Sequence, residues 1–302
     1  MKLLAVDIGG TKVAVALVTR QGAILGKQQQ PTDLAGPEAV ADQVAAMAAA
    51  LAQDEEGAEA VGVCVPAALA GPESDRVIWA PNLPGWQDVP FREMLQARLR
   101  RPVFLEFDGL AAALGEWWVG AGRGYRTVAS VIIGTGIGGG LVIDGRPWAG
   151  RDRLAGAVGW FPLAGPTGPD HWENLAAGPA IARRARYLLQ MGHVSTLEPG
   201  GLTARAVFDA ARQGDRLARQ VVREAATSIG QGVSAIISLL NPEVVVLGGS
   251  VGQQGDLLLD TVREVAGRWA QPNSARDIPI VSSTLGEEAG LLGAAYAACL
   301  RL

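Results

Sequence analysis

Two apolar runs that meet at a glycine turn open the chain, and this arrangement constrains the fold more than any other feature. The runs cover residues 3–8 and 13–18, and Asp7, Gly9 and Gly10 stand where the first run ends. Glycine has no Cβ, so a turn of this kind leaves backbone N–H groups open to an anion. Asp7 is a carboxylate at the end of a strand, a suitable ligand for the magnesium ion that accompanies a nucleotide. The opening of the chain therefore predicts a phosphate-binding hairpin.

A second glycine cluster, residues 134–140, also lies between two apolar runs, 128–133 and 141–143. A single Gly-Gly turn is most often an ordinary hairpin turn. Two strand–glycine–strand units, each with a threonine in its turn, instead suggest two turns that close on one polyphosphate. The candidate phosphate-binding residues are Asp7, Gly9, Gly10, Thr11 and Lys12 in the first turn and Gly134, Thr135, Gly136 and Gly138 in the second.

Three of these side chains also have a simpler interpretation in which they bind no phosphate. Lys12 either contacts a phosphate or only extends from its turn into solvent. Thr11 and Thr135 either hydrogen-bond phosphate oxygens or pair across their own turns.

Length and charge limit the classes to which the chain can belong. Its 302 residues exceed what one typical core supports, so two α/β lobes are the natural division. The net charge of −4 comes without a basic run, which argues against a nucleic-acid partner. No stretch of about 18 uncharged apolar residues occurs, and Asp7 interrupts the one leader-like run. We therefore expect a cytoplasmic protein with no membrane partner.

The two cysteines, Cys64 and Cys299, both lie in apolar segments. Small buried core residues are the simplest interpretation, and they offer neither a disulfide framework nor a thiolate zinc site.

Apolar periodicity predicts alternating strands and helices along most of the chain. The expected strands are 3–8, 13–19, 24–28, 61–65, 103–106, 128–133, 141–143, 243–247 and 278–282. The expected helices are 37–53, 91–99, 109–119, 179–190, 203–211, 215–240, 257–269 and 289–300. Thr203 is a suitable N-cap, and Asn241 before a proline ends the long helix. Residues 145–178, rich in proline and tryptophan, are predicted to be a long functional loop.

Ordered segments along nearly the whole chain resemble the ROK family of bacterial sugar kinases and sugar-responsive repressors. Besides the two glycine turns, they are residues 80–86, 106–116, 244–250 and 286–295. The resemblance implies a two-lobed α/β fold of the actin-like ATPase (ribonuclease H-like) type, with an active-site cleft between the lobes. Residues 1–108 plus about 287–302 would form the smaller N-terminal lobe, and residues 109–286 the larger one. It also implies ATP and Mg²⁺ as cofactors, a sugar as partner and a homodimer.

Asp108 is the candidate general base for phosphoryl transfer to a hydroxyl. This reaction needs charge neutralisation, alignment and a carboxylate that accepts the hydroxyl proton. Asp108 follows an apolar strand and precedes a helix, whose N–H groups would keep it ionised. The resemblance adds that the family's catalytic aspartate falls at this position; the alternative is a helix-capping aspartate without chemistry.

The resemblance also assigns ligand contacts elsewhere. Asn82 matches the position whose amide meets a sugar hydroxyl, and its alternative is an ordinary turn asparagine. Glu173 matches the glutamate that closes the sugar site, and its alternative is an isolated surface acid. Gly248 and Gly249 would face the adenosine, at the end of a buried strand where ligands of open sheets collect. The alternative for this pair is a tight turn between strand and helix.

Three positions depart from the family pattern within the expected sugar site. Phe107 replaces an asparagine, Ala157 a glutamate, and Trp160 a histidine that serves both sugar and zinc in typical members. The cysteine-rich zinc loop that should follow is also absent, and two histidines in the whole chain are too few to replace it. We therefore expect no zinc, and elemental analysis of the purified protein would test this.

These replacements remove hydrogen-bonding groups from one side of the expected pocket and add aromatic faces. They predict an acceptor that resembles a hexose around the reacting hydroxyl and differs on the opposite edge. Candidates are a glycoside or disaccharide stacked on Trp160, or a cyclitol, and free glucose is expected to be a poor substrate.

The leading interpretation is thus an ATP-dependent carbohydrate kinase that uses Asp108 and is not a plain glucokinase. The alternatives are a catalytically impaired ROK-type sugar-binding or regulatory protein, and a kinase that acts on a cyclitol or glycoside. The sequence leaves open whether the donor is ATP, another nucleotide or polyphosphate. A repressor is disfavoured because the first glycine turn begins near residue 7, which leaves no room for a DNA-reading helix before it.

Overall fold

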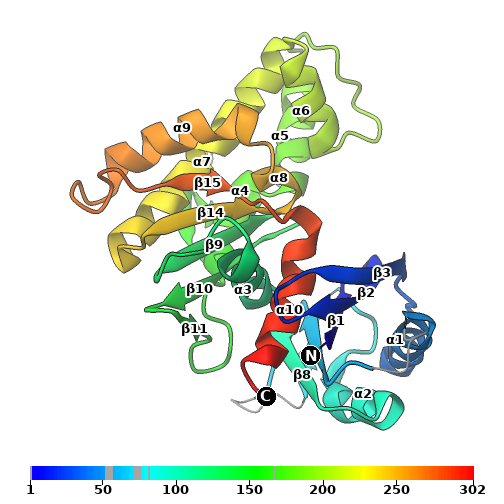
Figure 1. Ribbon diagram of the computed structural model, residues 1–302. Coiled ribbons are helices and arrows are strands. Elements are labelled where there is room, and N and C mark those ends of the chain that lie inside the picture. Colours follow the sequence, from blue (N-terminus) through cyan, green and yellow to red (C-terminus); the bar gives the residue numbers. More distant parts are fainter. Residues whose placement is uncertain (1, 52–56, 71–75, 81, 166–167) are drawn as a thin grey trace. The chain divides into compact units, whose positions relative to one another are not determined.

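The computed structural model describes residues 2–51, 57–70, 76–80, 82–165 and 168–302 (Figure 1). The chain divides into two compact units. The first contains residues 1–124, 140–156 and 287–302, and the second contains residues 125–139 and 157–286. The lobe limits expected from the sequence remain a prediction.

The first unit is built on a five-stranded sheet in the order β3-β2-β1-β4-β8. Strands β1 (Lys2–Ile8), β2 (Lys12–Thr19) and β3 (Ile24–Pro31) form the predicted antiparallel meander. Strands β4 (Ala60–Val65) and β8 (Val103–Phe107) continue the sheet parallel to β1. The carboxyl ends of β1, β4 and β8 therefore lie side by side at one edge.

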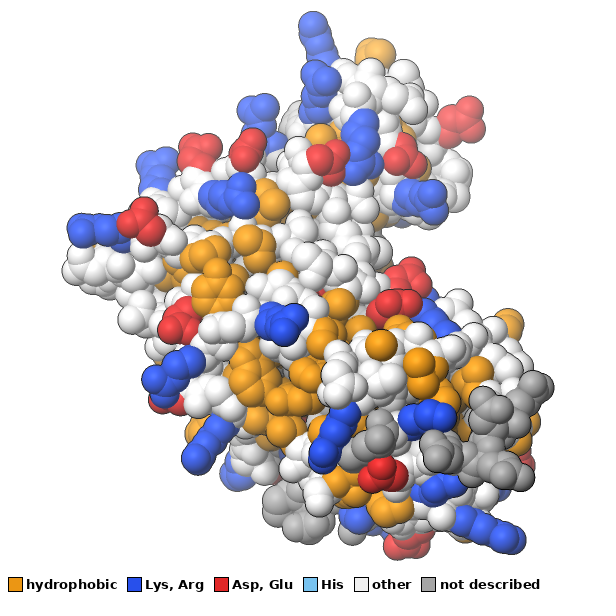
Figure 2. All heavy atoms as spheres, viewed as in Figure 1, with side chains coloured by type: hydrophobic (Ala, Val, Ile, Leu, Met, Phe, Trp, Pro, Cys, Tyr) orange, Lys and Arg blue, Asp and Glu red, His pale blue; other side chains and the backbone are white. Residues whose placement is uncertain are grey.

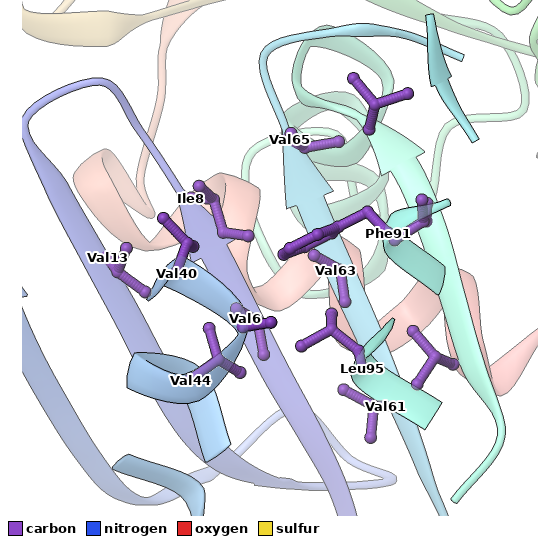
Figure 3. Close-up of a cluster of buried hydrophobic side chains, with 14 of the residues drawn as sticks. Val6, Ile8, Val13, Val40, Val44, Val61, Val63, Val65, Phe91 and Leu95 are labelled. Atoms are coloured by element: carbon purple, nitrogen blue, oxygen red, sulfur yellow. The ribbon is translucent and has the colours of Figure 1, made fainter. Parts of the chain in front are cut away.

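One face of this sheet is covered by α1 (Pro37–Leu51) and α2 (Phe91–Leu99). Figure 3 shows Val40 and Val44 of α1 beside Val6 and Val13 of the first two strands, and Phe91 and Leu95 of α2 beside Val61 and Val63 of β4. Because side chains alternate along a strand, Cys64 points to the opposite face. There it packs with Ala111 of α3 (Asp108–Val119) and Ala294 of α10 (Ala289–Cys299).

Helices α3 and α10 pack very closely. A Cβ at Gly293 would lie 1.6 Å from the carbonyl oxygen of Ala111, so only glycine fits there. Because Asp108 is the first residue of α3, this contact fixes the helix that carries the candidate base.

The second sheet has the order β11-β10-β9-β14-β15. Its strands are β9 (Val128–Ile133), β10 (Ile137–Ile143), β11 (Arg146–Trp148), β14 (Val244–Gly248) and β15 (Ile280–Ser282). Strands β9, β14 and β15 are parallel, and β10 runs along the chain from the second unit into the first. The helices of the second unit are α4 (Trp172–Ala176), α5 (Gly178–Gln190), α6 (Ala204–Arg212), α7 (Arg216–Leu240), α8 (Gly249–Gly252) and α9 (Gly255–Trp269).

Short elements complete both units. Strands β5 (Ala68–Leu69), β6 (Val77–Trp79) and β7 (Gln87–Val89) form a small antiparallel sheet in the first. In the second, a 3₁₀ turn, η1 (Val158–Trp160), precedes the antiparallel pair β12 (Pro162–Gly165) and β13 (Gly168–His171). A further 3₁₀ turn, η2 (Gly286–Glu288), precedes α10.

Most predicted elements are confirmed to within a few residues, and Thr203 caps α6 through a 3.2 Å hydrogen bond from the Ala206 N–H. Asn241 ends α7 in the left-handed conformation. The prediction of a long loop at 145–178 is wrong in part, because β11, β12, β13 and α4 lie within it. These elements are only three to five residues long, too short to show a hydrophobic period.

Charges are mixed on the face that Figure 2 shows, where Lys and Arg side chains stand among Asp and Glu. Among the described residues, no helix has both the length and the apolar character that a membrane crossing requires.

Candidate active site

The first glycine turn joins β1 to β2 and is held by backbone and side-chain hydrogen bonds. The Gly9 N–H donates to the Lys12 carbonyl at 2.8 Å, and the Thr32 hydroxyl donates to the Gly9 carbonyl at 2.6 Å. The Thr32 N–H donates in turn to the Thr11 carbonyl at 3.1 Å. The turn is therefore a fixed structure, with the Thr11 side chain exposed.

Gly10 and Asn82 lie against each other in the first unit. A Cβ at Gly10 would stand 3.0 Å from the Asn82 carbonyl oxygen and 3.2 Å from its Cβ. The structure thus brings the candidate sugar contact Asn82 to the first turn. It also gives Gly10 a packing role in addition to its predicted phosphate role.

Asp7 lies beside Cys64 and Gly290. The Cys64 thiol donates a hydrogen bond to the Asp7 carboxylate, and a Cβ at Gly290 would lie 3.3 Å from both Asp7 Oδ2 and Cys64 Sγ. Burial raises the pKa of Asp7, and the Cys64 hydrogen bond and the Lys12 charge offset part of this rise. Burial also raises the pKa of the Cys64 thiol well above its usual range, so the thiol stays protonated.

Lys12 forms an ion pair with Glu287 of η2 at 2.5 Å. Both side chains are exposed, so the pair contributes at most about 1 kcal/mol to stability. A phosphate could therefore compete for Lys12 at little cost. Whether Lys12 contacts a phosphate remains a prediction.

Asp108 begins α3 directly after β8, as predicted. Its Oδ1 accepts a 2.8 Å hydrogen bond from the Gly109 N–H. Burial, with a smaller contribution from the negative charge of Asp7, raises the pKa of Asp108 to about 6. The helix N–H groups therefore offset the desolvation of the carboxyl only in part, although it is still mostly ionised at pH 7.

The second glycine turn joins β9 to β10. It is closed by a 2.9 Å hydrogen bond from the Gly134 N–H to the Gly136 carbonyl, and the Gly178 N–H donates to the Gly134 carbonyl at 2.8 Å. A Cβ at Gly138 would meet nothing within 4 Å, and at Gly134 only the Ser250 hydroxyl at 3.9 Å. Neither glycine has a positive φ. Neither packing nor backbone conformation requires these two glycines, so the space beside them is open to a ligand.

Gly248 ends β14 and Gly249 begins α8, the predicted strand-to-helix turn. Gly249 has φ +77°, and a Cβ there would lie 2.4 Å from the Ile133 carbonyl oxygen. The turn itself therefore requires a glycine at position 249, whether or not a ligand binds there. A contact of this turn with adenosine remains a prediction.

The carboxylate of Glu173 lies against the second glycine turn. Its Oε2 accepts a 3.4 Å hydrogen bond from the Ile137 N–H and would be 3.0 Å from a Cβ at Gly136. A Cβ at Gly159 would stand 3.3 Å from the same oxygen. The structure therefore places Glu173 beside a predicted phosphate turn and beside the segment that carries Ala157 and Trp160.

The replaced positions differ in exposure. Trp160 is 64% exposed, and its ring meets His171 edge-on at 4.9 Å between centroids. Phe107 and Ala157 are half-buried. Within the second unit, the antiparallel pair of β12 and β13 occupies the segment in which typical family members were expected to carry the zinc loop.

Magnesium could be held by Asp7 together with water and phosphate oxygens. The described residues contain no group of three or more His, Cys, Asp or Glu side chains arranged around a common metal position. A single carboxylate plus phosphate oxygens is a normal ligand set for Mg²⁺, which keeps several waters. The donor set of this turn therefore fits a magnesium ion that arrives with a nucleotide.

Sequence reasoning missed the partners that hold these groups in place. These partners come from segments distant in the sequence. Asp7 is contacted by Cys64 and Gly290, and Lys12 pairs with Glu287. Glu106 pairs with Arg153 and Arg301. In the structure, Cys64 stands level with Asp7 and Glu106 on neighbouring parallel strands. The sequence predicted these strands but not their register.

The chain is similar to known proteins along nearly its whole length. Residues 3–299 match the model of the ROK family. The chain is 35% identical to a glucokinase of Thermotoga maritima over 308 aligned positions, covering 98% of this chain and 96% of the relative. A ROK family glucokinase from Streptomyces griseus, solved with glucose and AMPPNP, superimposes with a TM-score of 0.84 at 31% identity, covering 99% of this chain and all of that one.

A ROK hexokinase from Thermus thermophilus superimposes with a TM-score of 0.82 at 35% identity, covering 100% of this chain and 99% of that one. These neighbours confirm the predicted fold class, and the cleft between lobes stays a prediction. The family match extends over nearly the whole sequence and includes both glycine turns and Asp108, so the chain belongs to the ROK family.

Proposed function

We propose that this protein is an ATP-dependent carbohydrate kinase in which Asp108 is the general base. The observation that carries the proposal is the environment of Asp108: a carboxyl at the start of α3, with a pKa of about 6, in the same unit as Asp7 and the first glycine turn. A base with a pKa close to the working pH is mostly ionised and still accepts a proton well. The similarity to glucokinases, one of them solved with glucose and AMPPNP, supports the reaction class.

The reaction would begin with an acceptor hydroxyl that donates its hydrogen bond to the Asp108 carboxylate. The hydroxyl oxygen forms a bond to the γ-phosphorus while the bond to the β,γ-bridging oxygen breaks, and Asp108 takes the hydroxyl proton. ADP leaves with the bridging oxygen. Asp108 thus supplies alignment as well as a proton acceptor, because its own position is fixed by the Gly109 N–H.

The nucleotide phosphates would be bound by the N–H groups of both glycine turns. The open space at Gly134 and Gly138 supports this role for the second turn. Asp7 would hold Mg²⁺, which neutralises charge on the phosphates when bound. Lys12 would exchange Glu287 for a phosphate oxygen, and Gly248 and Gly249 would face the adenosine.

The acceptor would be a sugar or sugar-like molecule held by Asn82, Asp108 and Glu173. Phe107, Ala157 and Trp160 would form an apolar side of its pocket, which favours a glycoside, a disaccharide or a cyclitol over free glucose. The exposed ring of Trp160 supports this, because an exposed indole is available to stack on an apolar or sugar face. We further propose a cytoplasmic homodimer, on family resemblance.

The test is ATP consumption by the purified protein with a panel of sugars, glycosides and cyclitols, run in parallel with Asp108→Asn. The proposal expects acceptor-dependent release of ADP by the natural protein. A protein that binds a sugar and releases no ADP would instead be the sugar-binding or regulatory alternative. Replacing ATP by inorganic polyphosphate in the same assay distinguishes the phosphoryl donor.

A further inference from the structure

The carboxylate of Glu106 is buried two residues before Asp108 and is held from several directions. Its side chain is 2% exposed. Its Oε1 accepts hydrogen bonds from the Phe107 N–H at 3.1 Å and from Arg153 Nη2 at 2.7 Å. Its Oε2 accepts from Arg153 Nη2 at 2.6 Å and from Arg301 Nη2 at 2.7 Å. The end of β8, where Phe107 and Asp108 stand, is therefore fixed through one carboxylate.

Arg153 reaches this carboxylate from the segment between β11 and η1. Its side chain is also buried, at 9% exposed, and its backbone is left-handed, with φ +58°. Residues other than glycine, asparagine and aspartate rarely adopt this backbone conformation. Where they do, the surrounding structure holds them in it. The Ala155 N–H closes the same segment by donating to the Ala149 carbonyl at 3.1 Å. The ion pair with Glu106 thus joins this segment to β8.

Arg301 holds the same strand from the end of α10. Its Nη1 donates to the Leu105 carbonyl at 3.1 Å while its Nη2 bonds Glu106. Its guanidinium also lies 6.0 Å from the centre of the Phe104 ring. The two arginines therefore fasten different segments to β8, and they share the Glu106 carboxylate as a partner.

Stability alone is a weak reason for a buried charged cluster. Removing charges from water costs several kcal/mol per ion, and apolar residues of similar size often stabilise a core equally well. What such a cluster does well is to fix one geometry, because charge-assisted hydrogen bonds between a guanidinium and a carboxylate are short and directional. The location suggests which geometry matters, since Phe107 and Asp108 follow Glu106 directly, and Ala157 and Trp160 follow Arg153 by four and seven residues.

We propose that Arg153 is a positioning residue for the acceptor pocket. Arg153 holds the Glu106 carboxylate, which in turn binds the Phe107 N–H. Arg153 also precedes Ala157 and Trp160 in the chain, so its own fixed position restrains the start of the segment that carries them. It would thereby set the affinity for the acceptor and leave the nucleotide site unchanged. This inference rests on the proposed function for the identity of the ligand and adds to it a residue that touches no substrate.

The test compares Arg153→Met and Arg153→Lys with Arg151→Met. Arg151 belongs to the same segment, but its side chain is 91% exposed and pairs with the adjacent Asp152, so it is a matched control. We expect Arg153→Met to raise the KM for the acceptor about tenfold, which is roughly 1.4 kcal/mol, and to change the KM for ATP less than twofold. Arg153→Lys should recover part of the acceptor affinity because it restores a cation beside Glu106.

A purely structural role predicts a different pattern, in which melting temperature and active fraction fall while the two KM values stay as they were. That result, or a parallel rise of both KM values, would overturn the inference. If Arg153→Met does not fold, Arg153→Lys decides by the same ratio of acceptor KM to ATP KM.

Acceptor titrations followed by tryptophan fluorescence give the comparison without turnover. Binding by the natural protein without ADP release would refute the proposed kinase, and the affinity of the Arg153 variants would still decide the positioning role. Unchanged acceptor affinity in an active Arg153→Met protein would refute the positioning role and leave the kinase intact. Absence of any acceptor binding would refute both.

Discussion

The negative charge of Asp7 at the end of β1 acts on Asp108 at the start of α3 and helps to raise its pKa to about 6. Burial of the Asp108 carboxyl is the larger cause. The two residues are distant in sequence, and the parallel strands β1, β4 and β8 bring them to one edge of the same sheet. A pair of carboxyl groups whose environments differ is typical of acid–base chemistry.

The pH dependence of catalysis should follow this carboxyl. Only ionised Asp108 accepts a proton, so kcat/KM for the acceptor should rise with pH through about 6 and level off above pH 7. Initial rates between pH 5 and 8, at saturating Mg-ATP and low acceptor, measure this profile. A flat profile across pH 5–7 would contradict the assignment of Asp108 as base.

Stability should show the cost of holding that charge. The pKa of Asp108 is about 6 in the folded protein and 3.8 in its reference state, so the folded state binds more protons between these values and loses stability as pH rises through them. Asp108→Asn removes this penalty. The difference of about 2 pKa units corresponds to roughly 3 kcal/mol at pH 7, so we expect a Tm roughly 6–12 °C higher than that of the natural protein at pH 7, and little difference near pH 3.

Asp260→Asn is the control for that comparison, because the Asp260 side chain on α9 is fully exposed. Its Tm should match the natural protein at both pH values. A destabilised Asp108→Asn at pH 7 would show that the ionised carboxyl is favourable in the fold, which is the opposite of what its raised pKa requires.

Gly138 should be important for the nucleotide and unimportant for folding. Its Cβ position is empty and its backbone is ordinary, so Gly138→Ala should leave the Tm within about 1 °C. A methyl group beside the phosphates should raise the KM for ATP roughly tenfold, which is about 1.4 kcal/mol. Thermal unfolding and ATP kinetics on the same preparation measure both effects.

Gly267→Ala on α9 is the matched control, since nothing lies within 4 Å of its Cβ position either. It should leave the KM for ATP unchanged. An unchanged KM for ATP in Gly138→Ala would remove the second turn from the phosphate site.

Trp160 should distinguish substituted sugars from free ones. Trp160→Ala should weaken binding of a glycoside with an apolar aglycone by roughly twofold to tenfold. This range corresponds to the loss of one aromatic contact, which is worth about 0.5–1.5 kcal/mol. The KM for the unsubstituted sugar should change little. Trp269→Ala, an equally exposed tryptophan on α9, is the control, and equal effects of both substitutions on the glycoside would refute the stacking role.

Local patterns in the sequence were enough for the elements that carry the site. Continuous apolar runs predicted β1, β2, β4 and β9, and the strand-to-helix step placed Asp108 at the start of α3. These features depend on neighbours within a few residues. The pairing of β12 with β13 was missed because both strands are only four residues long, with β13 exposed throughout and no residue of β12 fully buried.

Contacts over long separations were not predictable in the same way. The Glu106–Arg153 pair joins residues from β8 and from a segment after β11, and an arginine in the left-handed conformation has no sequence signature. The approach of Gly290 to Asp7 likewise follows from the packing of α10 on β1 and β4, which no local pattern encodes. The pKa of Asp108 depends on such packing, which is why helix N–H groups alone suggested a more readily ionised carboxyl.

The most direct test of the central claim is ADP release in the presence and absence of a carbohydrate acceptor, measured for the natural protein and for Asp108→Asn. We predict acceptor-dependent release by the natural protein and a loss of about 10²-fold or more in the variant, as expected for a general base. Retention of near-natural activity by Asp108→Asn, or absence of acceptor-dependent release across the whole panel, would contradict the claim that this protein is a carbohydrate kinase with Asp108 as its base.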